Sequence, residues 1–183
     1  MTVQVPVVVG VDLSLTCTGI AVSSGPHRGL HQIKTTGRAD AGLTDRSTRL
    51  TRIVRDINNL RVEAGASLVV IEGPSLGQTR QAGTHDRSGL WWLVVQTCTD
   101  WGVPIVEVAP ACRARYATGR GNASKDEVLA QVVRRWPDWD VVDNNTADAL
   151  VLASMGARYL GHPIDAVPAL QQSALEAVRW PPT

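Results

Sequence analysis

The sequence predicts one α/β domain in which a mixed five-stranded sheet is flanked by helices. Three strand-like segments come first along the chain, and strands then alternate with helical segments. That order is typical of a sheet with both antiparallel and parallel strand pairs. The chain has 183 residues, of which 44% are apolar. This length allows one domain with a substantial core but is too short for two full-sized domains.

Five short apolar segments carry the strand signal. Pro6 is compatible with the first of them, because proline is tolerated at the start of a strand. The run SSGPHRG, between the second and third segments, is rich in turn-forming residues and predicts a short connection. The five predicted strands cover residues 5–11, 19–23, 30–35, 67–72 and 103–108.

Helical periodicity follows in much of the remaining chain. In residues 43–65, five aliphatic residues share one helical face with arginines opposite, and Gly65 ends the helix. Ser124 and Glu127 form the pattern of a capping box, and Asp143 is placed to cap a later helix. Residues 77–86 are predicted to form a loop. Further helices are predicted over residues 88–101, 125–136, 144–160 and 165–180.

Composition argues against a membrane or secreted protein. No window approaches the roughly 18 consecutive apolar residues of a membrane span, and the N-terminal residues lack the charged-then-apolar order of a signal peptide. The cysteines Cys17, Cys98 and Cys112 are odd in number, far apart and without CxxC spacing. They favour a reducing cytosol over a disulfide framework or a zinc site, and we expect small buried side chains. The expected location is the cytosol of a bacterium or of a phage-infected host.

The charge pattern suits contact with phosphates only locally. The formal net charge is +1, so there is no global electrostatic attraction to nucleic acid. Between residues 80 and 135, eight arginines and lysines and His85 stand against five acids, which is a mild basic bias. Sixteen of the eighteen basic residues are arginine, and Lys34 and Lys125 are the only lysines.

Two of the predicted core strands end in a carboxylate, Asp12 and Glu72. Because ligand sites in α/β sheets gather beyond strand ends, we expect these side chains to face each other. A third acid, Asp148, lies between Ala147 and Ala149 in an apolar helical segment, and such small neighbours allow close approach to the sheet. Three converging carboxylates repel one another unless a cation compensates them, and hard oxygen ligands favour Mg²⁺ or Mn²⁺.

Each of these acids also has an ordinary structural explanation. An Asp after a strand is often a turn or cap residue, Glu72 before Gly-Pro fits a surface acid, and Asp148 fits an ion pair with an arginine. The joint pattern of three acids on otherwise apolar elements is what favours a metal site.

Four short motifs occur in order along the chain, GVDLSLTCTGIAV, LVVIEGPS, GRGNASKDEV and NNTADALVLA. In this order and at this spacing they resemble the RuvC-type Holliday junction resolvases of the ribonuclease H-like superfamily. The resemblance covers about residues 7–160. It implies a ribonuclease H-like fold, with a nuclease domain in residues 1–162 and a C-terminal helical extension of the same domain in residues 163–183. The compact, divergent form favours a phage-encoded member.

The resemblance implies roles for individual residues. Asp12 matches the family's acid on the first strand, which bridges two metal ions. Glu72 matches the acid that ends the fourth strand, and Asp148 matches the acid on the C-terminal helix. Asn145 stands where the family has another Asp or a His, which leaves an amide oxygen as a candidate ligand. Lys125 matches a lysine near the scissile phosphate, although such a residue is also an ordinary solvated residue of a first helical turn. The implied cofactor is Mg²⁺ or Mn²⁺, two ions per active site.

The resemblance also implies a symmetric homodimer that binds branched DNA, especially four-way junctions. The family dimerises through the helix that corresponds to residues 88–101, so Trp91, Trp92 and Leu93 are candidate interface residues. The alternative is that one of the two tryptophans lies in the core and the other is exposed. The family's aromatic residue beyond the Glu is replaced by Ser75 and Leu76, and residues 78–87 are expected to supply contacts instead. The candidate DNA-binding residues are Arg80, Arg87, Arg113, Arg115, Arg120 and Lys125.

The function implied by the resemblance is metal-dependent, structure-selective cleavage of four-way or other branched DNA by two-metal phosphodiester hydrolysis. Two alternatives stay open. One is a ribonuclease H-like nuclease for flaps, forks or RNA, and the other is a non-cleaving junction-binding module, which Asn145 keeps open. The actin and sugar-kinase superfamily has a similar first phosphate loop, but it needs two such domains, for which 183 residues are too few.

Overall fold

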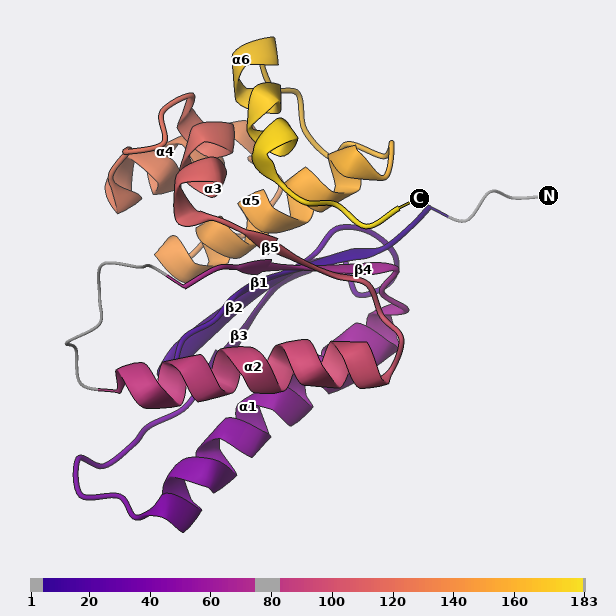
Figure 1. Ribbon diagram of the computed structural model, residues 1–183. Helices are drawn as coiled ribbons and strands as arrows, with labels where there is room; N and C mark the ends of the chain where they lie inside the picture. Colours follow the sequence, from indigo (N-terminus) through magenta and orange to yellow (C-terminus); the bar gives the residue numbers. More distant parts are fainter. Residues whose placement is uncertain (1–4, 75–82, 183) are drawn as a thin grey trace.

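A computed structural model describes residues 5–74 and 83–182 and contains the expected mixed five-stranded sheet (Figure 1). The strand order is β3-β2-β1-β4-β5. The first three strands form an antiparallel meander, whereas β4 and β5 run parallel to β1. The strands are β1 (Val8–Asp12), β2 (Cys17–Val22), β3 (Gly29–Lys34), β4 (Leu68–Glu72) and β5 (Ile105–Val108).

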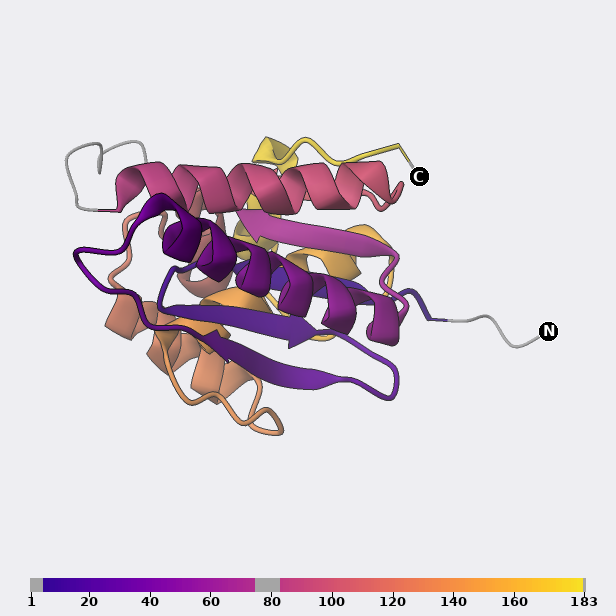
Figure 2. The same cartoon turned by 90° about the horizontal axis from the view of Figure 1, so that it is seen from below.

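Helices cover both faces of the sheet and give three layers. The long helices α1 (Leu43–Ala64) and α2 (Thr84–Asp100) lie side by side on one face, as Figure 2 shows. Helix α5 (Asn144–Tyr159) lies on the opposite face (Figure 1). The remaining helices are α3 (Pro110–Thr118), α4 (Lys125–Arg135), α6 (Ala169–Gln172) and the 3₁₀ turn η1 (Ser173–Ala177).

The core strands read as continuous apolar runs because each of their faces packs against a helical layer. Successive side chains alternate between the two layers. Val8 and Val70 belong to the apolar cluster around α5, whereas Val9 and Ile71 belong to the cluster under α1 and α2. The ends of β1 and β4 are thereby held between two packed layers.

Glycines let α5 approach the sheet unusually closely. A Cβ atom added to Gly10 would lie 2.2 Å from the carbonyl oxygen of Ala149, and one added to Gly19 would lie 2.2 Å from that of Asn145. Only hydrogen side chains fit at these two points of β1 and β2. This close packing brings the first turns of α5, with Asp148, down to the end of β1.

The helix ends follow the predicted capping signals. Ser124 and Glu127 form a complete capping box at α4, and Asp143 accepts a hydrogen bond from the Thr146 N–H at α5. Gly65 ends α1 in the left-handed conformation, with φ of 64°. Local sequence therefore fixes where these helices begin and end.

Two helical predictions differ from the structure. Helix α3 was not expected, because a nine-residue segment with proline at its start shows too few turns for a clear periodicity. The single helix expected over residues 165–180 is replaced by α6 and η1, which together end at Ala177. Beyond them the chain is extended, so that Trp180 stacks on Tyr159 with ring centroids 4.5 Å apart. This stacking, and the hydrogen bond that the Trp180 indole N–H donates to the Leu175 carbonyl oxygen at 3.0 Å, hold the segment in its non-helical path.

The loop expected over residues 77–86 lies partly outside the described residues, and Thr84, His85 and Asp86 belong to the first turn of α2. Cys98 is buried and Cys17 and Cys112 are half-buried, and all three are free thiols. Within residues 5–74 and 83–182, no helix is long and apolar enough to cross a membrane.

Candidate active site

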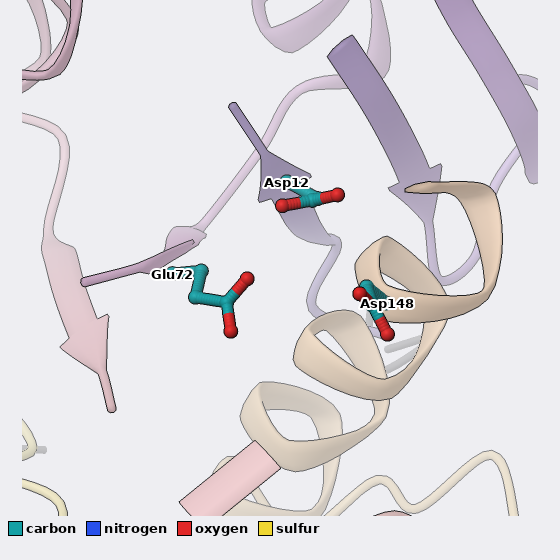
Figure 3. Close-up of side chains that lie close together, drawn as sticks. All are labelled: Asp12, Glu72 and Asp148. Carbon is teal, nitrogen blue, oxygen red and sulfur yellow. The ribbon is translucent and has the colours of Figure 1, made fainter. Parts of the chain in front are cut away.

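Three elements bring the predicted acids together at one end of the sheet (Figure 3). Asp12 is the last residue of β1 and Glu72 the last residue of β4, and these strands are parallel neighbours in register. Asp148 reaches the same point from the second turn of α5. One carboxylate oxygen from each residue lies within 4.8 Å of the others. The expectation that the three acids converge is met in the structure.

An arginine completes this acidic cluster. Arg113 lies on α3, directly after β5, and its side chain is 8% exposed. Its Nε donates a hydrogen bond to Glu72 Oε1 at 2.9 Å, and its Nη1 donates to Asp148 Oδ1. The sequence led us to expect Arg113 among the residues that contact DNA, with Lys125 near the scissile phosphate, and the structure shows its side chain inside the acidic cluster. The reason is tertiary: α3 begins directly after β5 and packs against α5, and the Arg113 side chain reaches Glu72 and Asp148 from there.

The environment of the cluster raises the pKa of two of its carboxyl groups, Asp12 and Asp148. Burial, followed by the charges of Glu72 and Asp148, raises the pKa of Asp12 well above its ordinary value. Burial also raises the pKa of Asp148 to about 6, although Arg113 opposes this rise. Burial lowers the pKa of Arg113, but the carboxylates of Glu72 and Asp148 outweigh it and the net direction is upward. A divalent cation would replace protons on these acids.

The donor set fits a hard divalent cation. Three carboxylates on rigid elements offer oxygen atoms that lie close enough together to bind one ion. Carboxylate oxygens are the ligands that Mg²⁺ and Mn²⁺ prefer. Asn145 is half-buried in the first turn of α5, with its backbone carbonyl pressed against Gly19. It lies three residues before Asp148 and so on nearly the same helical face.

Lys125 lies at the first turn of α4 and is exposed. Its positive charge lowers the pKa of Asp148, which places it within electrostatic reach of the cluster. Arg115 and Arg120 are exposed, and Arg120 pairs with Glu127. Arg87 is half-buried in the first turn of α2, and Arg80 lies outside the described residues. Of the described candidates, Arg115 and Arg120 therefore lie on the surface, outside the cluster.

The two tryptophans of α2 have different environments. Trp91 is half-buried, and its indole N–H donates a hydrogen bond to the carbonyl oxygen of Glu72 at 3.1 Å. Trp92 packs edge-to-face against Trp91 but is 64% exposed. Sequence reasoning missed the link from Trp91 to Glu72, because no local pattern reports which backbone carbonyl an indole will reach. It also missed the exposed Trp101, just beyond α2.

The two most informative sequence comparisons are with proteins of the same name. No protein-family model matches the sequence. The chain is 31% identical over 120 residues to the crossover junction endodeoxyribonuclease RuvC of Synechococcus sp. strain WH7803, a match that covers 65% of this chain and 76% of that protein. It is 28% identical over 163 residues to RuvC of Synechococcus sp. strain CC9311, covering 81% of this chain and 96% of that protein.

Solved structures agree in fold. Thermus thermophilus RuvC superposes with a TM-score of 0.65 at 18% identity, covering 87% of this chain and 99% of that one. The same protein in complex with a Holliday junction substrate gives 0.63 at 21% identity, covering 88% and 99%. The yeast mitochondrial Holliday junction resolvase Ydc2 gives 0.53 at 10% identity, covering 94% and 81%. The fold is therefore ribonuclease H-like, and the chain belongs to the RuvC family of crossover junction endodeoxyribonucleases.

Proposed function

We propose that this protein is a metal-dependent endodeoxyribonuclease that resolves four-way DNA junctions by hydrolysing phosphodiester bonds. The observation that carries the proposal is the convergence of Asp12, Glu72 and Asp148 within 4.8 Å at the carboxyl ends of two core strands. Membership of the RuvC family supports the same activity.

The three carboxylates would hold divalent cations, Mg²⁺ or Mn²⁺, two per site during cleavage, with Asn145 as a further candidate ligand. Such cations activate water and stabilise the leaving oxygen when bound. The chain itself supplies rigid placement. Asp12 and Glu72 are fixed by the paired strands and Asp148 by the tight contact of α5 with Gly10, so the carboxylates do not have to reorganise when a cation binds.

Basic residues around the cluster would bind and orient the DNA backbone. Lys125 is exposed within reach of Asp148, and a compact ammonium there suits the charge that develops at the scissile phosphate. Arg115 and Arg120 are exposed on the neighbouring segments. Arg120 would exchange its pairing with Glu127 for a DNA phosphate.

A homodimer is the proposed assembly, formed through the exposed side of α2. Trp92 is 64% exposed and Leu93 is 44% exposed, and large apolar side chains of this kind are enriched in interface cores. Trp91 behind them ties the same helix to the end of β4. A two-fold dimer would present two sites to the two strands of a near-symmetric junction.

The C-terminal residues 163–183 are proposed to be part of the same domain, as an extension that supports α3. Asp165 binds the Arg158 guanidinium and accepts a hydrogen bond from the Tyr116 hydroxyl of α3 at 2.9 Å. A DNA substrate and three free thiols suit action in the cytosol.

A panel of substrates tests the proposal. Labelled four-way junctions, flaps, forks and RNA–DNA hybrids of matched sequence are incubated with the protein in Mg²⁺, in Mn²⁺ and in EDTA. Paired symmetric nicks in the junction that need a cation support a resolvase. Cleavage of flaps, forks or hybrids with intact junctions assigns another nuclease activity. Junction binding without cleavage in either metal assigns the non-cleaving module that Asn145 leaves open.

A further inference from the structure

The guanidinium of Arg113 occupies one side of the acidic cluster. It donates to Glu72 from Nε and to Asp148 from Nη1, so it bridges two of the three carboxylates that would hold metal. Both contacts are well shielded, with side-chain exposures of 8% for Arg113, 15% for Glu72 and 4% for Asp148. Asp12, the third acid, has no ion pair with Arg113 among the described salt bridges and faces the cluster from the end of β1.

The cluster has a charge balance that suits one divalent cation. Three carboxylates and one guanidinium leave two formal negative charges, and Asn145 adds none. An arginine side chain keeps its positive charge in proteins, so this compensation is permanent, unlike that of a proton or a lysine. One divalent cation neutralises the set, whereas a second would give the set, with the buried guanidinium included, a net charge of +2.

Neighbouring contacts hold α3, and Arg113 with it, in place. Arg135 of α4 donates hydrogen bonds to the carbonyl oxygens of Tyr116 at 3.2 Å and Ala117 at 2.7 Å, near the end of α3. Arg135 also donates to Gln171 of the C-terminal segment, which packs against the same helix. The guanidinium of Arg113 therefore starts from a helix that is tied to two other elements.

We propose that Arg113 is a built-in cation of the active site, which limits the DNA-free protein to one divalent cation, bound on the Asp12 side of the cluster. A second cation joins only when the scissile phosphate adds its negative charge. This inference rests on the proposed function, since it takes the acidic cluster as the cation site, but its test contains no DNA.

The test is calorimetric titration of the full-length protein with Mn²⁺. The wild type is expected to bind one ion. Arg113→Gln removes the charge and is expected to bind two, with the second at least about tenfold tighter than any second binding by the wild type. Arg134→Gln, which removes an exposed arginine of α4, is the matched control and should bind one ion. Asp12→Asn should lose the tight ion.

A second measurement uses only the wild-type protein and so does not depend on whether a variant folds. The Nε–H of Arg113 is hydrogen-bonded and shielded, and its NMR signal should persist when diamagnetic Mg²⁺ saturates the wild type. Loss of that signal on Mg²⁺ binding would mean that the cation displaces the guanidinium, and would overturn the proposal. Two Mn²⁺ ions on the wild type, or one on both the wild type and Arg113→Gln, would overturn it as well. A protein that shows the expected stoichiometries but cleaves no DNA would refute the nuclease activity and leave the inference standing.

Discussion

Gly10→Ala is the substitution that probes most directly how the fold builds the site. The new Cβ atom would lie 2.2 Å from the carbonyl oxygen of Ala149 and 2.5 Å from the backbone nitrogen of Ala153. Ordinary contact begins at 3.4 Å, so α5 must move away from β1 by about 1.2 Å, the difference between the two distances. Both neighbours are backbone atoms of a buried helix, and neither can rotate aside as a flexible side chain does.

This displacement sets the expected magnitudes. Overpacking of a well-packed core costs roughly 1–3 kcal/mol of unfolding free energy. Asp148 moves with α5, and a misplacement of about 1 Å at a catalytic centre costs about 10²-fold in rate. Gly10→Ala should therefore lower both stability and junction cleavage, with the loss of activity larger than the loss of folded protein explains.

Urea unfolding and single-turnover junction cleavage measure the two effects. Gly42→Ala is the matched control, because Gly42 has φ of −69° and no atom within 4 Å of an added Cβ. Gly42 is the N-cap of α1, where Ala is less favourable than Gly, so the variant's stability should fall by no more than about 1 kcal/mol, and its cleavage rate should stay at the wild-type level. If Gly10→Ala behaved like Gly42→Ala in both assays, the close packing of α5 against β1 would not be what positions Asp148.

Three further predictions concern the buried acids and the exposed face of α2. The pKa of Asp148 is raised from 3.8 to about 6, so the folded state binds this proton more tightly than the unfolded state does. In EDTA the bound proton therefore adds up to roughly 3 kcal/mol to the free energy of unfolding below about pH 4, and this stabilisation is lost as the pH rises through 6. Urea unfolding at pH 5 and pH 7.5 should show about half of this loss, roughly 1.4 kcal/mol, in the wild type and a smaller loss in Asp148→Asn, which keeps Asp12. An equal pH dependence of the two proteins would contradict the assignment. Asp165→Ala removes a carboxylate with a fully buried side chain that pairs with two arginines, and should lower the free energy of unfolding by about 3–5 kcal/mol, whereas the exposed Asp40→Ala should leave it nearly unchanged. Thermal unfolding that ranks the two variants equally would refute the buried network. Trp92→Ala should raise the dissociation constant of the proposed dimer at least about tenfold, as measured by sedimentation. The monomer should stay as stable as the wild type because the Trp92 side chain is 64% exposed, and Leu170→Ala, at another exposed residue, should not weaken the dimer. Unchanged association of Trp92→Ala would place the interface elsewhere.

Sequence patterns are most informative where the physics is local. The capping residues at Ser124 and Asp143 and the left-handed Gly65 are recognisable because a cap is built from residues within one turn of each other. Asp12 and Glu72 could also be recognised, since a charge at the end of an otherwise buried strand needs a reason. The convergence of these acids with Asp148 follows from strand order and from the small residues of α5.

The features that sequence could not supply depend on tertiary distance. Arg113 is 41 residues from Glu72 and 35 residues from Asp148, and only the path of α3 brings its guanidinium to them. In the sequence it is one arginine among sixteen, and we predicted that it contacts DNA, with Lys125 near the scissile phosphate, but not that it pairs with the acids. The indole N–H of Trp91 reaches the backbone of Glu72 for the same kind of reason, through a helix–sheet contact that no periodicity encodes.

Carboxylate-to-amide substitutions in the acidic cluster test the central claim most directly. Asp12→Asn, Glu72→Gln and Asp148→Asn keep each side chain's shape and remove its charge, while Glu63→Gln does the same to an exposed acid of α1. Binding and nicking of a labelled four-way junction are measured for all four proteins in Mg²⁺. The account predicts that the three cluster variants bind the junction with nicking reduced at least about 10³-fold, and that Glu63→Gln nicks it like the wild type. Nicking at the wild-type rate by the cluster variants would contradict the account, because the chemistry would then reside outside these three carboxylates.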